Sequence, residues 1–237
     1  MLLSLKGSFF LISNILADIK LLKLFKEKNI KNIIELGVGL GRDTIFFAKN
    51  SIFVEALDYS KTSIKNIVEL GAGLGRDTIF FAKNSFHVEA LDYSKTSIKS
   101  IINKSTKLNL TKFVKPKIFD VRKKLPFKDS SIDGCFSHML YCMALTNLEL
   151  ENLNKEICRI LKPKGINIYT VRNTDDGDYK NGIHRGEDLY ENDGFIVHFF
   201  SKEKVKQLSN GFEVLNIEKF DEGKFPRKLF IVKNRKI

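Results

Sequence analysis

Three glycines and two acidic residues form the clearest chemical signature in the sequence. Gly71, Gly73 and Gly75 follow a short apolar run and precede a helical pattern, a context in which glycines let the backbone approach a ligand closely. Glu69 ends that apolar run, and Asp92 ends the next one, 21 residues after Gly71. The two carboxylates are acceptors for a cationic amine and a ribose diol. The pattern therefore predicts a ligand that carries both a positive charge and vicinal hydroxyls.

The glycine turn departs from the dinucleotide-binding fingerprint. That fingerprint reads GxGxxG, whereas Arg76 stands where its last glycine would be, so this turn reads GxGxG. The alternative is a turn that only packs a helix against a sheet. The occurrence of both acids together with the glycines favours ligand binding.

A second group of polar residues lies in the connection between residues 172 and 199. These 28 residues show no clear periodicity, which predicts a lid or a binding loop. Arg172 and Arg185 could fix an anionic substrate by forked contacts, and His184 could take a proton from it.

His138 is a second candidate proton acceptor, and each of these residues also has a plainer interpretation. His138 could merely line the ligand pocket. Arg185 could pair on the surface with Glu187 and Asp188, and His198 stands among apolar neighbours typical of a core.

Alternating strand and helix patterns must position these groups. Helical patterns cover residues 77–83, 94–108, 147–161 and 201–208, and strand-like runs cover 67–70, 88–91, 117–119, 131–136, 166–171, 213–217 and 228–232. Strands separated by helices predict a doubly wound, mostly parallel α/β sheet with both faces covered. The last two runs have no helix between them, which predicts an antiparallel hairpin.

An internal repeat dominates the first half of the chain. Residues 32–65 and 66–99 agree at 30 of 34 positions, and the second copy follows the first without a linker. Each copy has the pattern of a βαβ unit. One sheet cannot hold both copies at its centre. We favour the second copy for the ligand-binding position, because it runs directly into the following helix and Ala72 crowds a ligand less than Val38. The first copy would then be an added edge unit or a loosely packed excursion.

The chain is predicted to have three parts. Residues 1–31 are expected to form a helical segment rather than a secretory signal, residues 32–65 the extra βαβ unit, and residues 66–237 the main domain.

Composition limits the classes of function. The formal charge is +12, but lysines dominate the basic residues and are spread along the chain, so nucleic-acid binding is disfavoured. No apolar stretch is long enough for a membrane span. Cys135, Cys142 and Cys158 show no metal-ligand spacing, which indicates reduced thiols, a cytoplasmic location and no metal site.

Several motifs resemble those of the class I S-adenosylmethionine-dependent methyltransferases over roughly residues 66–234. They are ELGAGLGRD, the acid in LDYS, Asp120-Val121, LPFKDSSIDGCFSHML and RILKPKG. The resemblance implies a seven-stranded, Rossmann-like sheet and S-adenosyl-L-methionine as the cofactor. The GRDTIFFA helix and the VRNT, HRGED and VHFF stretches look most like small-molecule methyltransferases of the tellurite-resistance and thiopurine types.

The same resemblance assigns roles to individual residues. The three glycines would line the methionine part of the cofactor. Asp92 would hold the ribose hydroxyls, Asp120 and Val121 would meet the adenine, and Ser137 would lie near the sulfonium. Glu69 and Tyr93 complete the predicted set of cofactor-binding residues.

The sequence thus predicts methyl transfer to a small molecule by in-line displacement, a reaction that mainly requires alignment and exclusion of water. Two alternatives remain: an RNA or protein methyltransferase, and a non-catalytic variant of the repeated chain. No NPPY-like run follows the fourth strand and no Pro-Cys pair occurs, which disfavours a base methylase. The methyl acceptor and the oligomeric state are left open.

Overall fold

The computed structural model describes residues 2–5, 8–11, 32–36, 53–56, 65–223 and 227–237. The chain divides into two compact units, Met1–Ser63 and Ile64–Ile237. Within these described stretches, no helix is both long and apolar enough to cross a membrane.

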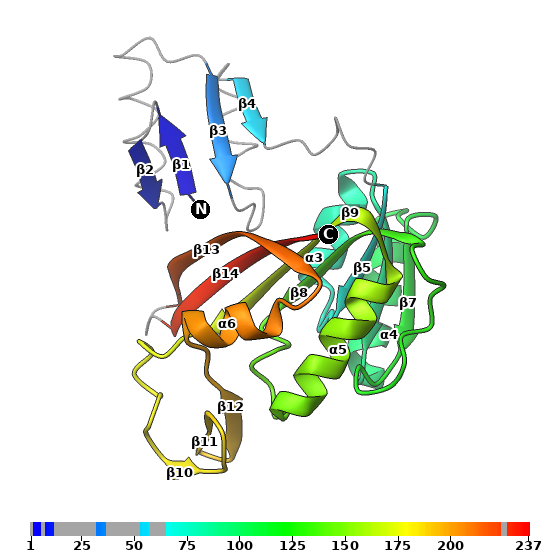
Figure 1. Cartoon of the computed structure of the whole chain (residues 1–237). Helices are drawn as coiled ribbons and strands as arrows, with labels where there is room; N and C mark the ends of the chain where they lie inside the picture. The colour runs from blue at the N-terminus through cyan, green and yellow to red at the C-terminus, as the bar shows by residue number, and fades with distance from the viewer. Residues whose placement is uncertain (1, 6–7, 12–31, 37–52, 57–64, 224–226) are drawn as a thin grey trace. The chain divides into compact units, whose positions relative to one another are not determined.

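The second unit is built on a seven-stranded sheet with the strand order β13-β14-β9-β8-β5-β6-β7 (Figure 1). The strands are β5 (Asn66–Leu70), β6 (His87–Asp92), β7 (Val114–Ile118), β8 (Ile132–His138), β9 (Leu161–Arg172), β13 (Phe212–Glu222) and β14 (Arg227–Lys236). The five strands from β5 to β9 run parallel, whereas β14 is antiparallel to both β9 and β13. This confirms the predicted doubly wound sheet with its terminal antiparallel pair.

Helices cover both faces of this sheet. They are α3 (Arg76–Lys83), α4 (Lys95–Lys107), α5 (Asn147–Ile160) and α6 (Lys202–Leu208), and each begins and ends within one residue of its predicted bounds. Side-chain caps explain three of the four starts: Ser94 and Ser201 accept backbone N–H groups, and Thr146 forms a capping box with Glu149. In Figure 1, α5 and α6 lie in front of the sheet and α3 and α4 behind it.

Alternation along β5 divides the core into two layers. Val68 and Leu70 are fully buried in the cluster that includes Ile157 of α5. Ile67 belongs to the other cluster, which includes Ile101 of α4. Because side chains alternate across a strand, Glu69 shares the α3 and α4 face with Ile67.

Asp133 of β8 fixes the start of the seven-stranded sheet. Its Oδ2 accepts the backbone N–H groups of Lys65 and Asn66 at 3.0 and 2.8 Å, and Lys162 donates to its Oδ1 at 2.6 Å. This carboxylate therefore secures the junction between the two repeat copies at the start of β5.

The second repeat copy supplies β5, α3 and β6, as we favoured. The strands of the first copy, β3 (Asn32–Leu36) and β4 (Phe53–Ala56), pair in parallel with each other, as in a βαβ unit, but belong to a separate four-stranded sheet. The prediction of an edge unit on the main sheet was therefore wrong, since the edge strands of that sheet are β7 and β13.

The predicted N-terminal helix is also wrong where the structure describes it. Residues Leu2–Leu5 (β1) and Ser8–Leu11 (β2) are antiparallel strands, and β1 pairs with β3. Short apolar runs do not distinguish a strand from a buried helix, and Gly7 between two such runs is a hairpin signal that we did not use. Residues 12–31 lie outside the described part.

The connection after β9 is more regular than predicted. It contains a small antiparallel sheet of β10 (Ile183–His184), β11 (Leu189–Asn192) and β12 (Phe195–His198). We call residues 173–198 the cap segment. It lies at the lower end of the sheet in Figure 1, where α5 also begins.

Candidate active site

The turn after β5 and the end of β6 form one hydrogen-bonded unit. Gly71 and Ala72 donate their backbone N–H groups to the Leu91 carbonyl at 2.8 and 3.0 Å. Gly73 donates to Asp92 Oδ2 at 2.7 Å, and the Ser94 N–H donates to Asp92 Oδ1 at 2.8 Å. The structure thus brings the predicted glycines and Asp92 together, and Asp92 orders both the turn and the start of α4.

The three glycines of the turn serve different physical purposes. All three have positive φ, at 68°, 52° and 80° for Gly71, Gly73 and Gly75. A Cβ on Gly75 would lie 2.6 Å from Ile101 Cγ1, and one on Gly71 would lie 3.0 Å from Leu140 Cδ1. A Cβ on Gly73 would meet nothing within 4 Å. Gly75 therefore packs α3 against α4, whereas Gly73 faces open space where a ligand can approach the backbone.

Glu69 is buried beneath the turn rather than exposed beside it. The Thr78 hydroxyl of α3 donates to its Oε2, and the residue is 2% exposed. Burial raises the pKa of Glu69 to about 8. Burial therefore favours the neutral, protonated form of this side chain over the carboxylate that we predicted as an acceptor for a cationic amine.

The residues assigned to the nucleoside surround the ends of the next strands. Tyr93 is 74% exposed and offers an open aromatic face beside Asp92. Arg122 binds both carboxylate oxygens of Asp120 at 2.9 and 2.8 Å, and its hydrogen bond is the main reason that the pKa of Asp120 is lowered. Val121 packs against the hydrophobic core.

Ser137 is buried, and its hydroxyl has no hydrogen-bond partner among the described residues. A buried polar atom without a partner is costly, and such atoms often mark a site for a water molecule or a ligand.

His138 lies at the carboxyl end of β8 in a group that sequence reasoning missed. Its Nδ1 is 2.9 Å from Thr170 Oγ1, and its Nε2 is 3.4 Å from Glu222 Oε1. Arg76 approaches the same Glu222 oxygen at 3.9 Å. The hydrogen bond with His138 is the main cause of the lowered pKa of Glu222. Because both ring nitrogens have partners, His138 would have to release one of them to act as a base.

The two arginines predicted to bind an anionic substrate are already paired with carboxylates. Arg172 is buried, donates to Asp176 Oδ2 at 3.0 Å and also pairs with Asp178. Arg185 donates from Nε to Glu191 Oε2 at 2.6 Å. The expected surface ion pair of Arg185 therefore exists, with Glu191 in place of the neighbours we named.

The remaining histidines of the cap segment differ in burial. His184 is exposed, stacks on Tyr190 with ring centroids 4.9 Å apart and lies 2.9 Å from the Glu187 carbonyl. His198 is completely buried, as predicted for a core residue. Neither joins His138 in one constellation.

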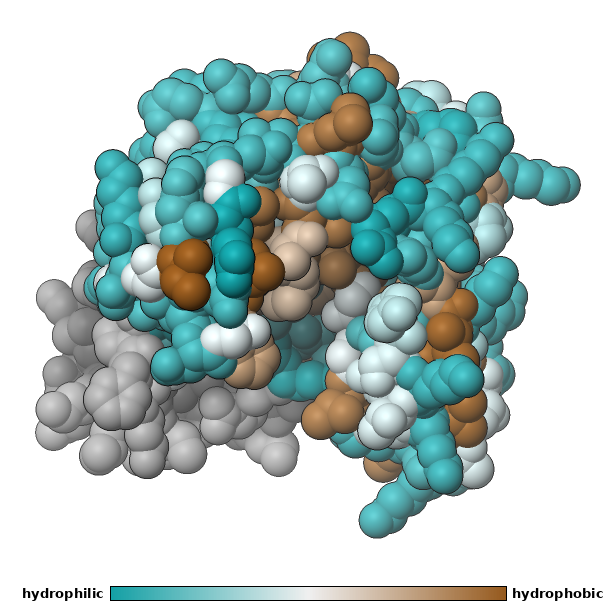
Figure 2. Space-filling model, turned by 90° about the horizontal axis from the view of Figure 1, so that it is seen from below, coloured by the Kyte–Doolittle hydropathy of each residue, from teal (hydrophilic) through white to brown (hydrophobic). Residues whose placement is uncertain are grey.

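Figure 2 shows the molecule from below, toward the ends of the strands where these groups lie. Hydrophilic residues cover most of this face, and hydrophobic side chains gather around a hollow near its centre. In doubly wound sheets, ligands bind at the carboxyl ends of the strands.

The sheet order, the terminal antiparallel strand and the turn beside Asp92 define the class I methyltransferase fold. Residues 67–165 match the family model described as a methyltransferase domain. The second unit therefore contains a methyltransferase domain and has the fold of S-adenosylmethionine-dependent methyltransferases, which supports S-adenosylmethionine as its cofactor.

Solved structures with the same fold are distant in sequence. An S-adenosylmethionine-dependent methyltransferase from Methanosarcina mazei is 19% identical, with a TM-score of 0.63 over 73% of this chain and 92% of that one. A Burkholderia thailandensis 1,6-didemethyltoxoflavin-N1-methyltransferase, with 1,6-didemethyltoxoflavin and S-adenosylhomocysteine bound, is 16% identical, with a TM-score of 0.60 over 76% and 75%. TehB from Haemophilus influenzae is 17% identical, with a TM-score of 0.60 over 76% and 61%. No curated protein sequence matches the chain.

Proposed function

We propose that the second unit transfers a methyl group from S-adenosylmethionine to a small-molecule acceptor, using the second repeat copy. The observation that carries the proposal is Gly73, whose N–H is held by Asp92 while the space beyond its Cα stays open. The bound toxoflavin precursor in the Burkholderia enzyme supports a small acceptor on this fold.

The residues at the strand ends fit this cofactor. The backbone of the Gly71–Gly75 turn would lie along its methionine part, Asp92 and Tyr93 would hold the ribose, and Asp120 and Val121 would border the adenine. The unpartnered Ser137 hydroxyl would lie near the sulfonium. When bound, the cofactor supplies a methyl group already activated for displacement, so these residues need only orient it and exclude water.

The acceptor would bind between the end of β8 and the cap segment. His138 and His184 are our candidates to hold or take its proton. We assign Arg172 and Arg185 to the architecture of the cap segment, because carboxylates already neutralise them. The free thiols of all three cysteines support the proposed cytoplasmic location.

Cofactor binding tests the assignment of the site to one repeat copy. Asp92→Ala removes the acceptor of two backbone N–H groups as well as the proposed ribose contact, so we expect affinity for S-adenosylhomocysteine to fall by about 100-fold. Asp58→Ala makes the same change in the first copy and should leave affinity within twofold. Isothermal titration calorimetry measures both, and equal losses would show that we have assigned the site to the wrong copy.

Deletion of residues 32–65 tests the proposed domain organisation. All seven strands of the main sheet lie outside the deleted stretch, so we expect the shortened chain to keep the melting temperature of its main transition and its affinity for S-adenosylhomocysteine. Differential scanning calorimetry and titration provide the measurements. Loss of binding in a folded deletion variant would contradict the organisation.

The acceptor class can be found by a screen with methyl-labelled cofactor. Thiols, metalloid oxyanions and small amines are the compounds to compare, with tRNA and a mixed protein substrate as the tests of the alternative function. Label in tRNA or protein alone would overturn the small-molecule proposal. Cofactor binding without transfer to any class would favour a non-catalytic role.

A further inference from the structure

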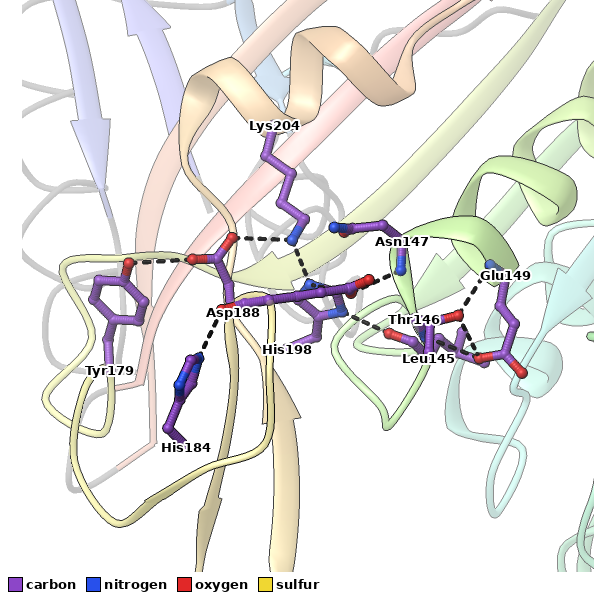
Figure 3. Close-up of polar contacts among 10 residues, drawn as sticks. Leu145, Thr146, Asn147, Glu149, Tyr179, His184, Asp188, His198 and Lys204 are labelled. Carbon is purple, nitrogen blue, oxygen red and sulfur yellow. Dashed lines mark hydrogen bonds and ion pairs between the residues drawn. The ribbon is translucent and has the colours of Figure 1, made fainter.

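A chain of polar contacts ties the cap segment to two other elements of the second unit (Figure 3). The Tyr179 hydroxyl donates to Asp188 Oδ1 at 3.3 Å, and Lys204 Nζ of α6 donates to Asp188 Oδ2 at 3.0 Å. Lys204 Nζ also contacts Nε2 of His198, whose Nδ1 lies 2.6 Å from the Leu145 carbonyl just before α5. His198 therefore joins β12 to α6 and to the start of α5.

The partners of His198 define its protonation state. The Leu145 carbonyl can only accept, so Nδ1 must carry a proton and donate it. The Lys204 ammonium can only donate, so Nε2 must be unprotonated and accept. These two contacts together therefore require a neutral His198 imidazole.

The two acids that face His198 Nε2 already bind other donors. His198 is completely buried, and burial, followed by the Lys204 charge, lowers its pKa. Lys204 faces the ring from α6, and the Leu145 carbonyl faces Nδ1 from the segment before α5. Glu187 and Asp188 are the facing acids: Glu187 Oε2 is 3.9 Å from Nε2 but accepts the Asn147 N–H at 2.8 Å, and Asp188 is bound to Lys204. A protonated ring would therefore direct Nε2–H at an ammonium group.

We propose that His198 and Lys204 form a pH-dependent latch, which holds the cap segment against the second unit at neutral pH and releases it in mildly acidic solution. Release separates β10–β12 from α6 and from the start of α5, and breaks the 3.0 Å bond from the His198 N–H to the Cys142 carbonyl. If the methyl acceptor binds beneath the cap segment, as the proposed function has it, the latch also controls its access. The latch itself does not depend on that function.

Hydrogen exchange of the full-length protein tests the latch without any substrate. We compare the protection factor, corrected for intrinsic exchange, of the His198 amide, which bonds to the Cys142 carbonyl outside the cap segment, at pH 7.5 and pH 5.0, with amides in the middle of α5 as the internal reference. Protection in the cap segment should fall by up to about 30-fold, because an ordinary histidine pKa of about 6.5 lies 1.5 units above pH 5.0. The α5 amides should change by less than threefold.

Three variants separate the latch from general acid sensitivity. Lys204→Met removes the opposing cation and leaves Asp188 without its lysine partner, so the pH dependence of protection should be smaller than in the wild-type protein, although the burial of His198 remains. His198→Gln should lower protection equally at both pH values. His184→Gln changes an exposed histidine of the same segment and should keep the full wild-type response.

Three results would overturn the proposal. The first is protection of the cap segment that does not change between the two pH values in the wild-type protein. The second is an undiminished pH response in Lys204→Met, and the third is loss of the pH response in His184→Gln. If His198→Gln does not fold, the other two variants still decide between these outcomes.

Discussion

Gly75→Ala is expected to destabilise the protein strongly, by about 2 to 5 kcal/mol. A left-handed backbone costs an alanine roughly 1 to 2 kcal/mol, and forcing a methyl group into a packed core adds about 1 to 3 kcal/mol. Both apply here, because φ is 80° and the new Cβ would lie 2.6 Å from Ile101 Cγ1. The melting temperature should fall by on the order of 10 °C. A fall of less than about 2 °C would show that α4 moves to accommodate the new methyl group with little loss of stability.

Gly73→Ala is the matched variant, and we expect it to weaken cofactor binding more than it lowers stability. Its φ of 52° carries the same kind of backbone cost, about 1 kcal/mol, but the new methyl group meets no protein atom within 4 Å. It projects instead into the space that we assign to the cofactor. We expect a folded protein whose affinity for S-adenosylhomocysteine is about 10- to 100-fold weaker.

The same change in the first repeat copy, Gly39→Ala, is the control. It should leave cofactor affinity unaltered, because that copy supplies no strand of the seven-stranded sheet. Calorimetric titration of the two variants then distinguishes a packing glycine from one that admits a ligand. Normal binding by Gly73→Ala would remove the main support for the proposed site.

The parts of the fold that were predicted correctly are those with local causes. The helix starts depend on capping side chains within three residues, and the buried strands on apolar runs bounded by glycine, proline and polar residues. The small strands β10–β12 were missed because two to four residues give no measurable period.

The errors at the site have non-local causes. Glu222 meets His138 only because the β13–β14 hairpin brings together residues 84 positions apart, and no spacing in the sequence announces that contact. The pairing of Arg172 had a usable signal, an acid four residues later at position 176, but an arginine beside acids is equally compatible with a substrate site. Glu69 was predicted to be a charged ligand-binding residue because the strand pattern shows on which face of the sheet it lies. The pattern does not show how deeply helix α3 buries it.

Glu69→Gln should change how stability depends on pH. The pKa of Glu69 is raised from 4.5 to about 8 mainly by burial, so the folded protein binds a proton that the unfolded chain releases. This contribution to stability is fully present below pH 4.5 and is lost as the pH rises through about 8. Between pH 6 and pH 9 the wild-type protein should therefore lose roughly 2 to 3 kcal/mol relative to Glu69→Gln, at about 1.4 kcal/mol per pH unit up to the folded pKa.

Urea unfolding at pH 6, 7, 8 and 9 measures this difference, and Glu35→Gln in the first repeat copy is the control that should follow the wild-type curve. Parallel curves for Glu69→Gln and the wild type would show that the carboxyl is ionised in the folded state.

A neutral Glu69 also predicts a binding result, because an amide replaces a protonated carboxyl with no change of charge. Glu69→Gln should bind S-adenosylhomocysteine within about threefold of the wild type at pH 7, whereas Asp92→Ala should not, which would place the essential carboxylate at the end of β6 rather than β5.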